Sequence, residues 1–283
     1  MAGVTTMIEV GRHRIEAIVY GTGTPAVVIE PSFGGSAAEW QAIAERIAEE
    51  TTVIAYNRAP YGASSRARDR RSAEEIAADL DGLLGGLEIV GPVILIGHSM
   101  GGVYLRTFAA RHLDRVAGMV LVDSSHEGQW AVLPAHYSLK NRLLGSILMP
   151  QIFFFSRRKW RGGADRWSMV REYRTFKRLT AADAPLAPGS LGERPLAVLT
   201  RGPDGKADSD GLWQAWYGLQ RDLAALSRNS RHVISDSPQH YLNEGDPDLI
   251  VAAVLDVIRC ARDGARSGTG EGGLMLEPRD RSE

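Results

Sequence analysis

Two hydrophobic patterns alternate along most of the chain. Short runs at 93–96 and 116–122 are apolar at nearly every position, which is typical of strands covered on both faces. Longer segments repeat their apolar residues every three or four positions, the spacing of a helix with one buried face. In 72–87 the repeating residues are Ile76, Leu80, Leu83, Leu84 and Leu87. Strands followed by helices in this way predict a doubly wound α/β fold around a mostly parallel sheet.

The same pattern places the individual elements. We expect strands at 26–30, 52–56, 93–96, 116–122, 195–200 and 231–235, and helices at 37–49, 72–87, 100–111, 213–226 and 248–262. Before them, residues 4–20 contain two short alternating runs around Gly11, which predict an antiparallel hairpin. Ser72 and Glu75 have the spacing of a capping box, which marks the start of a helix.

The alternation stops between residues 124 and 194. This segment has no strand of the same apolar kind and is rich in aromatic and basic residues, so we expect a helical insertion that forms a lid. Residues 1–123 and 195–262 then make up the core of the fold. The last segment, 263–283, is glycine-rich and polar, a composition that predicts a disordered tail.

Charge and composition exclude several classes of partner. The 283 residues contain 33 Lys and Arg against 34 Asp and Glu, a formal net charge of −1, which does not favour nucleic acid. Cys260 is the single cysteine and cannot form an internal disulfide. Because no signal peptide is recognisable either, we expect a cytoplasmic protein. The apolar segment 143–161 has a basic flank, and we expect it to pack within the lid rather than to contact lipid.

Motifs for cofactors and metals are missing from the sequence. The stretch Gly21-Thr22-Gly23 precedes a predicted strand instead of a helix, which excludes a dinucleotide loop. The sequence contains no Walker loop, no HExxH and no CxxC. We therefore expect neither a cofactor nor a metal.

The stretch VILIGHSMGG at 93–102 carries the main candidate for chemistry. Ser99 lies between a buried strand and a helix, with glycines at 97 and 101. In such a turn the serine hydroxyl projects above the carboxyl end of the sheet, and the glycines avoid collisions with neighbouring backbone. The helix that begins at residue 100 favours negative charge near its free N–H groups. Ser99 is therefore a candidate nucleophile.

Together with NRAPYGASS at 57–65 and EPSFGGSAAEW at 30–40, this stretch resembles the α/β-hydrolase superfamily, in its lid-bearing esterase-like branch. The resemblance covers residues 8–123 and 195–262. It implies an oxyanion hole formed by the backbone N–H groups of Met100 and Phe33. Two positions depart from the pattern: Pro31-Ser32 replaces the usual His-Gly, and Asn57 replaces an aspartate.

A nucleophilic serine needs a base and an acid. His240 follows the last predicted strand, in the loop that this fold brings over the serine, and it satisfies the chain order serine, acid, histidine. Two aspartates are candidates for the acid. Asp204 occupies the superfamily's usual position, although its Pro-Asp-Gly turn explains an aspartate by itself. Asp123 ends the strand next to the serine strand, where haloalkane dehalogenases are among the members that carry the acid. We favour Asp123 slightly because nothing local accounts for it.

These residues predict a serine hydrolase that cleaves a carboxylic ester or lactone through an acyl-enzyme, and a small to medium apolar substrate. Dehalogenases and epoxide hydrolases of this superfamily need an aspartate nucleophile, so Ser99 argues against both. Two alternatives remain open. One is another reaction of the same triad, such as carbon–carbon bond hydrolysis or perhydrolysis. The other is a ligand-sensing regulatory protein.

Overall fold

One sheet runs through the part of the protein that the computed structural model describes, namely residues 2–67, 70–136, 166–179, 181–205 and 210–267. Within these residues the sheet has eight strands in the order β1-β2-β4-β3-β5-β6-β7-β8. β1 and β2 form the predicted hairpin, β2 pairs antiparallel with β4, and all other pairs are parallel. The strands are β1 (Val4–Val10), β2 (His13–Tyr20), β3 (Val27–Glu30), β4 (Val53–Asn57), β5 (Val93–His98), β6 (Val116–Val122), β7 (Leu196–Thr200) and β8 (Ser230–Ile234).

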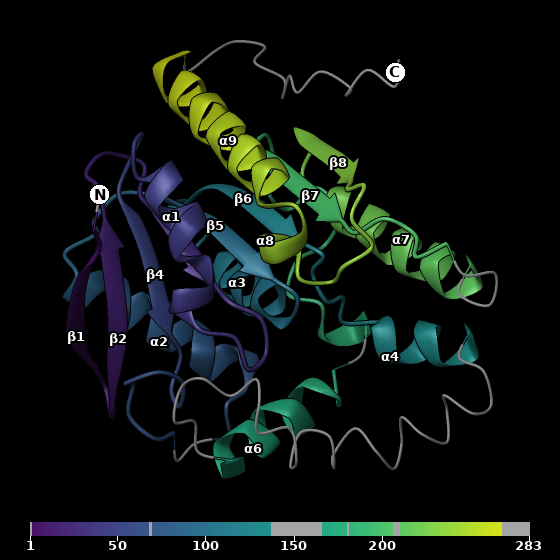
Figure 1. Ribbon diagram of the computed structural model, residues 1–283, viewed down its shortest axis with the longest axis horizontal. Coiled ribbons are helices and arrows are strands. Elements are labelled where there is room, and N and C mark those ends of the chain that lie inside the picture. Colours follow the sequence, from purple (N-terminus) through teal and green to yellow (C-terminus); the bar gives the residue numbers. More distant parts are fainter. Residues whose placement is uncertain (1, 68–69, 137–165, 180, 206–209, 268–283) are drawn as a thin grey trace.

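Helices cover both faces of the sheet (Figure 1). The main ones are α1 (Gln41–Ile47), α2 (Ala73–Gly86), α3 (Met100–Arg111), α7 (Asp210–Ala224) and α9 (Pro247–Ser267). Shorter helices are η1 (Ala37–Trp40), η2 (Leu113–Arg115) and α8 (Leu242–Gly245). The helix α2 begins at the predicted capping box, in which Ser72 and Glu75 bond reciprocally to each other's backbone N–H.

Successive residues of each central strand face opposite layers of the core. Val28 and Leu95 belong to the cluster that contains residues of α2, α3 and α7, whereas Ile29 and Ile96 belong to the cluster that contains residues of α1 and α9. Both layers are apolar, so the strands have no polar face. This is why they are continuous hydrophobic runs in the sequence.

The predicted insertion lies between β6 and β7, and its described part is helical. It contains α4 (Gln129–Val132), η3 (Leu133–His136), α6 (Arg166–Phe176) and η4 (Ala181–Asp183). The apolar segment 143–161 lies outside the described residues. Within the described residues, no helix is both long and apolar enough to span a membrane.

The C-terminal helix is longer than the sequence pattern predicts. The helix α9 continues to Ser267 instead of ending at 262, so residues 263–267 of the predicted disordered tail are helical. A glycine inside a helix costs only about 1 kcal/mol relative to alanine, and Gly264 alone does not end a helix whose earlier turns pack on the sheet. The remaining tail residues, 268–283, lie outside the described part of the chain.

Candidate active site

Ser99 occupies the sharp turn between β5 and α3, at the carboxyl edge of the parallel strands. Its backbone has φ 54° and ψ −121°, and a positive φ is strained for a residue with a side chain. The flanking glycines have no room for a Cβ. One on Gly97 would lie 2.6 Å from the Cα of Gly102, and one on Gly101 would lie 2.7 Å from the carbonyl oxygen of Pro31. The turn therefore needs glycines on both sides of the serine.

The loop between β8 and α8 brings His240 to this turn. Its Nδ1 lies 2.5 Å from Oδ2 of Asp123, and its Nε2 lies 2.9 Å from Oγ of Ser99. Because a carboxylate only accepts hydrogen bonds, Nδ1 carries the proton and Nε2 is left to accept from the hydroxyl. The side chain of His240 is about one third exposed, at 31%. In this arrangement Nε2 faces the serine hydroxyl, as a general base must, and the ring remains accessible.

Asp123 follows β6 directly and is fully buried. Its Oδ1 accepts hydrogen bonds from Nε1 of Trp216 at 2.6 Å and from the backbone N–H of Arg201 at 3.3 Å. Burial alone raises the pKa of the Asp123 carboxyl. The hydrogen bond to His240, the charges of His240 and Arg201 and the Trp216 bond outweigh burial and lower this pKa below its usual value. Asp123 is thus held ionised beside the imidazole.

The structure distinguishes the two candidate acids. Both ring nitrogens of His240 are occupied, one by Asp123 and one by Ser99, so no ring nitrogen remains for Asp204. Asp204 is exposed in the loop after β7. Of the two aspartates, the fold brings Asp123 to the imidazole.

A second histidine supports the loop that carries His240. His98 is buried just before the serine, and its Nε2 lies 2.9 Å from the carbonyl oxygen of His240. Since a carbonyl only accepts, the His98 nitrogen donates. Burial, together with the charge of His240, lowers the pKa of His98 to about 3, which keeps the ring neutral. Sequence reasoning did not single out His98 and missed this contact.

Met100 and Phe33, the expected oxyanion residues, come from adjacent pieces of backbone. Met100 is the first residue of α3, and Phe33 lies in the loop after β3. The next residue of α3, Gly101, is packed against the carbonyls of Glu30 and Pro31. The start of α3 therefore touches the loop that carries Phe33, as a two-donor oxyanion hole requires.

Aromatic side chains from the insertion pack beside these two residues. The ring of Phe33 lies 5.7 Å from that of Tyr173 on α6. Met100 belongs to a cluster with Phe176 of α6, and Phe33 and Trp130 pack against that cluster. The described part of the insertion thus contributes an apolar wall next to Ser99.

Sequence reasoning missed a buried polar network beside this wall. Arg58, Tyr61 and Tyr104 all bond to Glu172 of α6. The four residues come from a loop, a core helix and the insertion, and no local spacing in the sequence connects them. A single arginine or glutamate in the sequence does not indicate that it belongs to a buried network.

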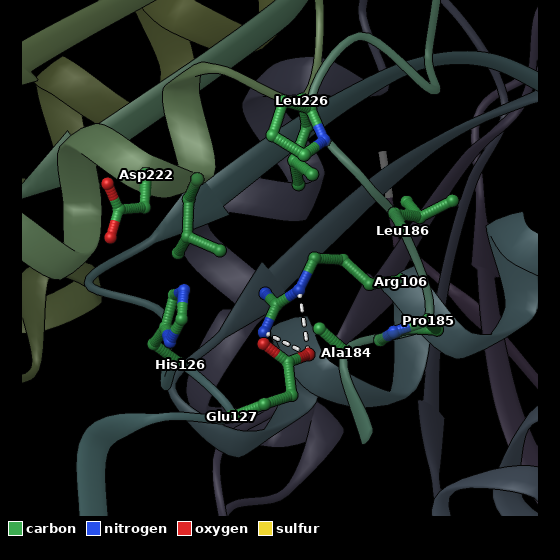
Figure 2. A pocket seen from close by; sticks show the side chains of 10 residues that line it. Arg106, His126, Glu127, Ala184, Pro185, Leu186, Asp222 and Leu226 are labelled. Atoms are coloured by element: carbon green, nitrogen blue, oxygen red, sulfur yellow. Dashed lines mark hydrogen bonds and ion pairs between the residues drawn. The ribbon is translucent and has the colours of Figure 1, made fainter. Parts of the chain in front are cut away.

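A cavity of about 140 Å³ lies between Arg106, Glu127 and α7. Figure 2 shows the ion pair of Arg106 with Glu127, with His126 and Asp222 to the left of this pair. Its lining is Arg106, His126, Glu127, Ala184, Pro185, Leu186, Pro188, Asp222, Leu223 and Leu226. Neither Ser99 nor His240 lines this cavity, so it is separate from the candidate active site.

Within the described residues, no group of three or more His, Cys, Asp or Glu side chains is arranged to hold a metal ion.

Known proteins resemble this chain in sequence. A family model described as the alpha/beta hydrolase fold matches residues 25–143. The chain is 24% identical over 237 residues to the uncharacterized protein YqjL of Bacillus subtilis (strain 168), covering 84% of this chain and 85% of that protein. It is 27% identical over 288 residues to the 2-(acetamidomethylene)succinate hydrolase of Mesorhizobium japonicum, covering 90% of this chain and 95% of that protein.

Solved structures resemble it in fold. An esterase from Exiguobacterium antarcticum superposes with a TM-score of 0.68 at 13% identity, covering 90% of this chain and 100% of that chain. At this identity the likeness concerns the arrangement of elements alone.

Proposed function

Since the chain has the α/β-hydrolase fold, and since the family model and the structural neighbours support that superfamily, we propose that it is a serine hydrolase of carboxylic esters or lactones. The single observation that carries the proposal is the contact series from Asp123 to His240 to Ser99, which ends on a serine in a strained turn at a helix N-terminus. This series has the geometry of a base-activated nucleophile.

In the proposed reaction, Oγ of Ser99 attacks the ester carbonyl carbon while its proton passes to Nε2 of His240. Asp123 stabilises the imidazolium that forms. The carbonyl oxygen becomes an oxyanion, which accepts hydrogen bonds from the N–H groups of Met100 and Phe33. The tetrahedral intermediate then expels the alcohol, which takes the proton from His240, and leaves an acyl group on Ser99.

Water completes the cycle. His240 takes a proton from the water molecule as its oxygen attacks the acyl carbon, and the same oxyanion site holds the second tetrahedral intermediate. Collapse of this intermediate releases the carboxylic acid and returns the proton to Ser99. The chemistry needs only the side chains and backbone named here. The apolar wall of Phe33, Met100 and Phe176 supports an apolar acyl or alcohol group of small to medium size.

Labelling with a fluorophosphonate tests the nucleophile. We expect the wild-type protein to be labelled, with the adduct located on Ser99 by peptide mass spectrometry, and Ser99→Ala to remain unlabelled. Ser190→Ala is a matched control because Ser190 lies before the amino end of β7, at the opposite edge of the sheet. Absence of labelling in the wild type, or labelling that survives Ser99→Ala, contradicts the proposal.

A second candidate is hydrolysis of a different bond by the same three residues. The relative named 2-(acetamidomethylene)succinate hydrolase supports it, because that protein's name describes a substrate that is not a simple ester. A panel of p-nitrophenyl esters of increasing acyl length separates the two candidates. Efficient turnover of at least one ester supports the esterase. A serine that is labelled but cleaves no ester in the panel supports the second candidate.

A further inference from the structure

A carboxylate from the insertion is buried in the core next to the expected oxyanion loop. Glu172 of α6 is 0% exposed. Its Oε1 accepts from Nη2 of Arg58 at 3.0 Å and from the hydroxyl of Tyr104 at 2.9 Å. Its Oε2 accepts from the hydroxyl of Tyr61 at 2.9 Å. Three charge-assisted bonds therefore fix the carboxylate, and with it the middle of α6.

The same guanidinium holds the loop after β3. Arg58 is almost fully buried and pairs with Glu30 at the end of that strand. Its Nη1 donates to the carbonyl of Pro31 at 2.8 Å, and its Nη2 donates to the carbonyl of Ser32 at 3.1 Å. Because Nη2 also bonds to Glu172, one nitrogen connects the insertion to the loop.

The carbonyl of Ser32 and the N–H of Phe33 belong to one peptide unit. This unit is planar, and in the trans form its C=O and N–H point in opposite directions. A donor that fixes the carbonyl therefore also fixes the direction of the N–H. The N–H of Gly35 donates to the same carbonyl at 3.1 Å, so the oxygen is held from two sides. These bonds therefore orient the N–H that Phe33 would donate to an oxyanion.

Pro31-Ser32 stands where the usual pattern has His-Gly, and this departure explains why the loop needs the contact with Arg58. Proline has no N–H, and within the described residues the hydroxyl of Ser32 is buried without a hydrogen-bond partner. The side chains of the loop thus give its backbone little support. The guanidinium supplies that support through two carbonyls.

From this geometry we propose that Arg58 and Glu172 are positioning residues of the oxyanion hole, in which the insertion helix α6, through Glu172, holds Arg58 on the peptide unit that carries the Phe33 N–H. The inference rests on the proposed function. It gives the insertion a part in building the catalytic site, in addition to covering it.

The test compares Glu172→Gln and Arg58→Lys with the wild type on a p-nitrophenyl ester. Glutamine keeps the size of Glu172 but loses its charge. Lysine keeps the charge of Arg58 but cannot reach two carbonyls and two carboxylates at once. Loss of a whole oxyanion donor lowers kcat roughly 10²- to 10³-fold. For a donor that is only misaimed we expect about a 10- to 100-fold fall in kcat, with KM within about twofold.

A tetrahedral inhibitor gives the readout that a merely structural role would not change. A trifluoromethyl ketone forms an adduct with Ser99 whose oxygen occupies the oxyanion site. Its Ki should rise by the same factor by which kcat/KM falls in each variant. Asp79→Asn is the matched control, because it neutralises a carboxylate that pairs with another buried arginine, Arg71, at 2.8 Å. It should lower the unfolding midpoint and leave kcat and Ki unchanged.

Tyr104→Phe provides a milder variant if the charge changes prevent folding. It removes one bond to Glu172 and keeps the ring, and we expect roughly a 3- to 10-fold fall in kcat with a matching rise in Ki. Folded variants whose kcat and Ki stay within about twofold of the wild type overturn the positioning role. In that case fluorophosphonate labelling of wild-type Ser99 leaves the proposed function standing. A wild type that is not labelled overturns both.

Discussion

At the scale of single residues, the choice between two aspartates gives the first prediction. Asp123→Asn should lower kcat for an ester substrate by about 10⁴-fold, because an amide at this position favours the wrong tautomer of His240. The expected loss rests on the position of Asp123, which is buried and bonds to Nδ1 of His240. Steady-state kinetics on the best p-nitrophenyl ester measure the effect.

Asp204→Asn is the matched control for that substitution. Asp204 is exposed in a loop where a Pro-Asp-Gly turn already accounts for it, so we expect kcat within about twofold of the wild type. Equal losses in both variants would contradict the assignment of Asp123.

The sequence favoured Asp123 only slightly, and the reason for this is physical. The residues around Asp123 in the sequence indicate only that an aspartate follows a strand. What distinguishes it is a set of distant donors, Trp216 and the backbone of Arg201, which the fold alone brings together. Arg58 and Glu172 illustrate the same limit, since 114 positions separate them in the chain.

At the scale of elements, two glycines at different places in helices should respond in opposite ways to alanine. Gly85 lies on the exposed side of α2, and a Cβ there meets no atom within 4 Å. Gly85→Ala should therefore stabilise the protein by about 0.4–1 kcal/mol, mainly by restricting the unfolded chain. Urea unfolding followed by circular dichroism measures the change.

Gly101→Ala should destabilise the protein. A Cβ at this position would overlap the carbonyl of Glu30 and lie 2.7 Å from that of Pro31, and both are backbone atoms that cannot turn aside. The start of α3 must then move away from the loop after β3. We expect a loss of about 2 kcal/mol or more and lower activity. An unchanged unfolding midpoint would show that this contact is looser than described.

Elements whose signal is local could be predicted. The doubly wound fold class is confirmed, as are the hairpin and the capped start of α2, because strand burial and helix capping are visible within a few residues. The short helix α8 was missed, since four residues carry too little periodicity to identify. The insertion could be located but not described, because Glu172 is fixed by core residues and not by its neighbours in α6.

At the scale of the whole molecule, the interior carries an unusual charge balance. Glu30 and Glu172 are both fully buried and share the guanidinium of Arg58. Burial raises the pKa of the Glu30 carboxyl from 4.5 to about 7, against the attraction of Arg58. Tyr56 also bonds to Glu30. Folding therefore depends on the protonation of one carboxyl group near neutral pH.

This dependence gives a pH prediction whose sign follows from linkage. The pKa of the Glu30 carboxyl is about 7 in the folded protein and 4.5 in the free group, so the folded protein keeps this proton up to about pH 7. The stabilisation from this proton is complete below about pH 4.5 and is lost as the pH rises through 7.

Glu30→Gln keeps an uncharged group at every pH. Its free energy of unfolding should match the wild type near pH 4.5 and exceed it at pH 8, by on the order of 3 kcal/mol. Urea unfolding at the two pH values measures the difference. Glu74→Gln, at an exposed position of α2, should show no such change. A Glu30→Gln variant whose advantage does not grow with pH would mean that Glu30 is ionised throughout and that Arg58 balances both carboxylates.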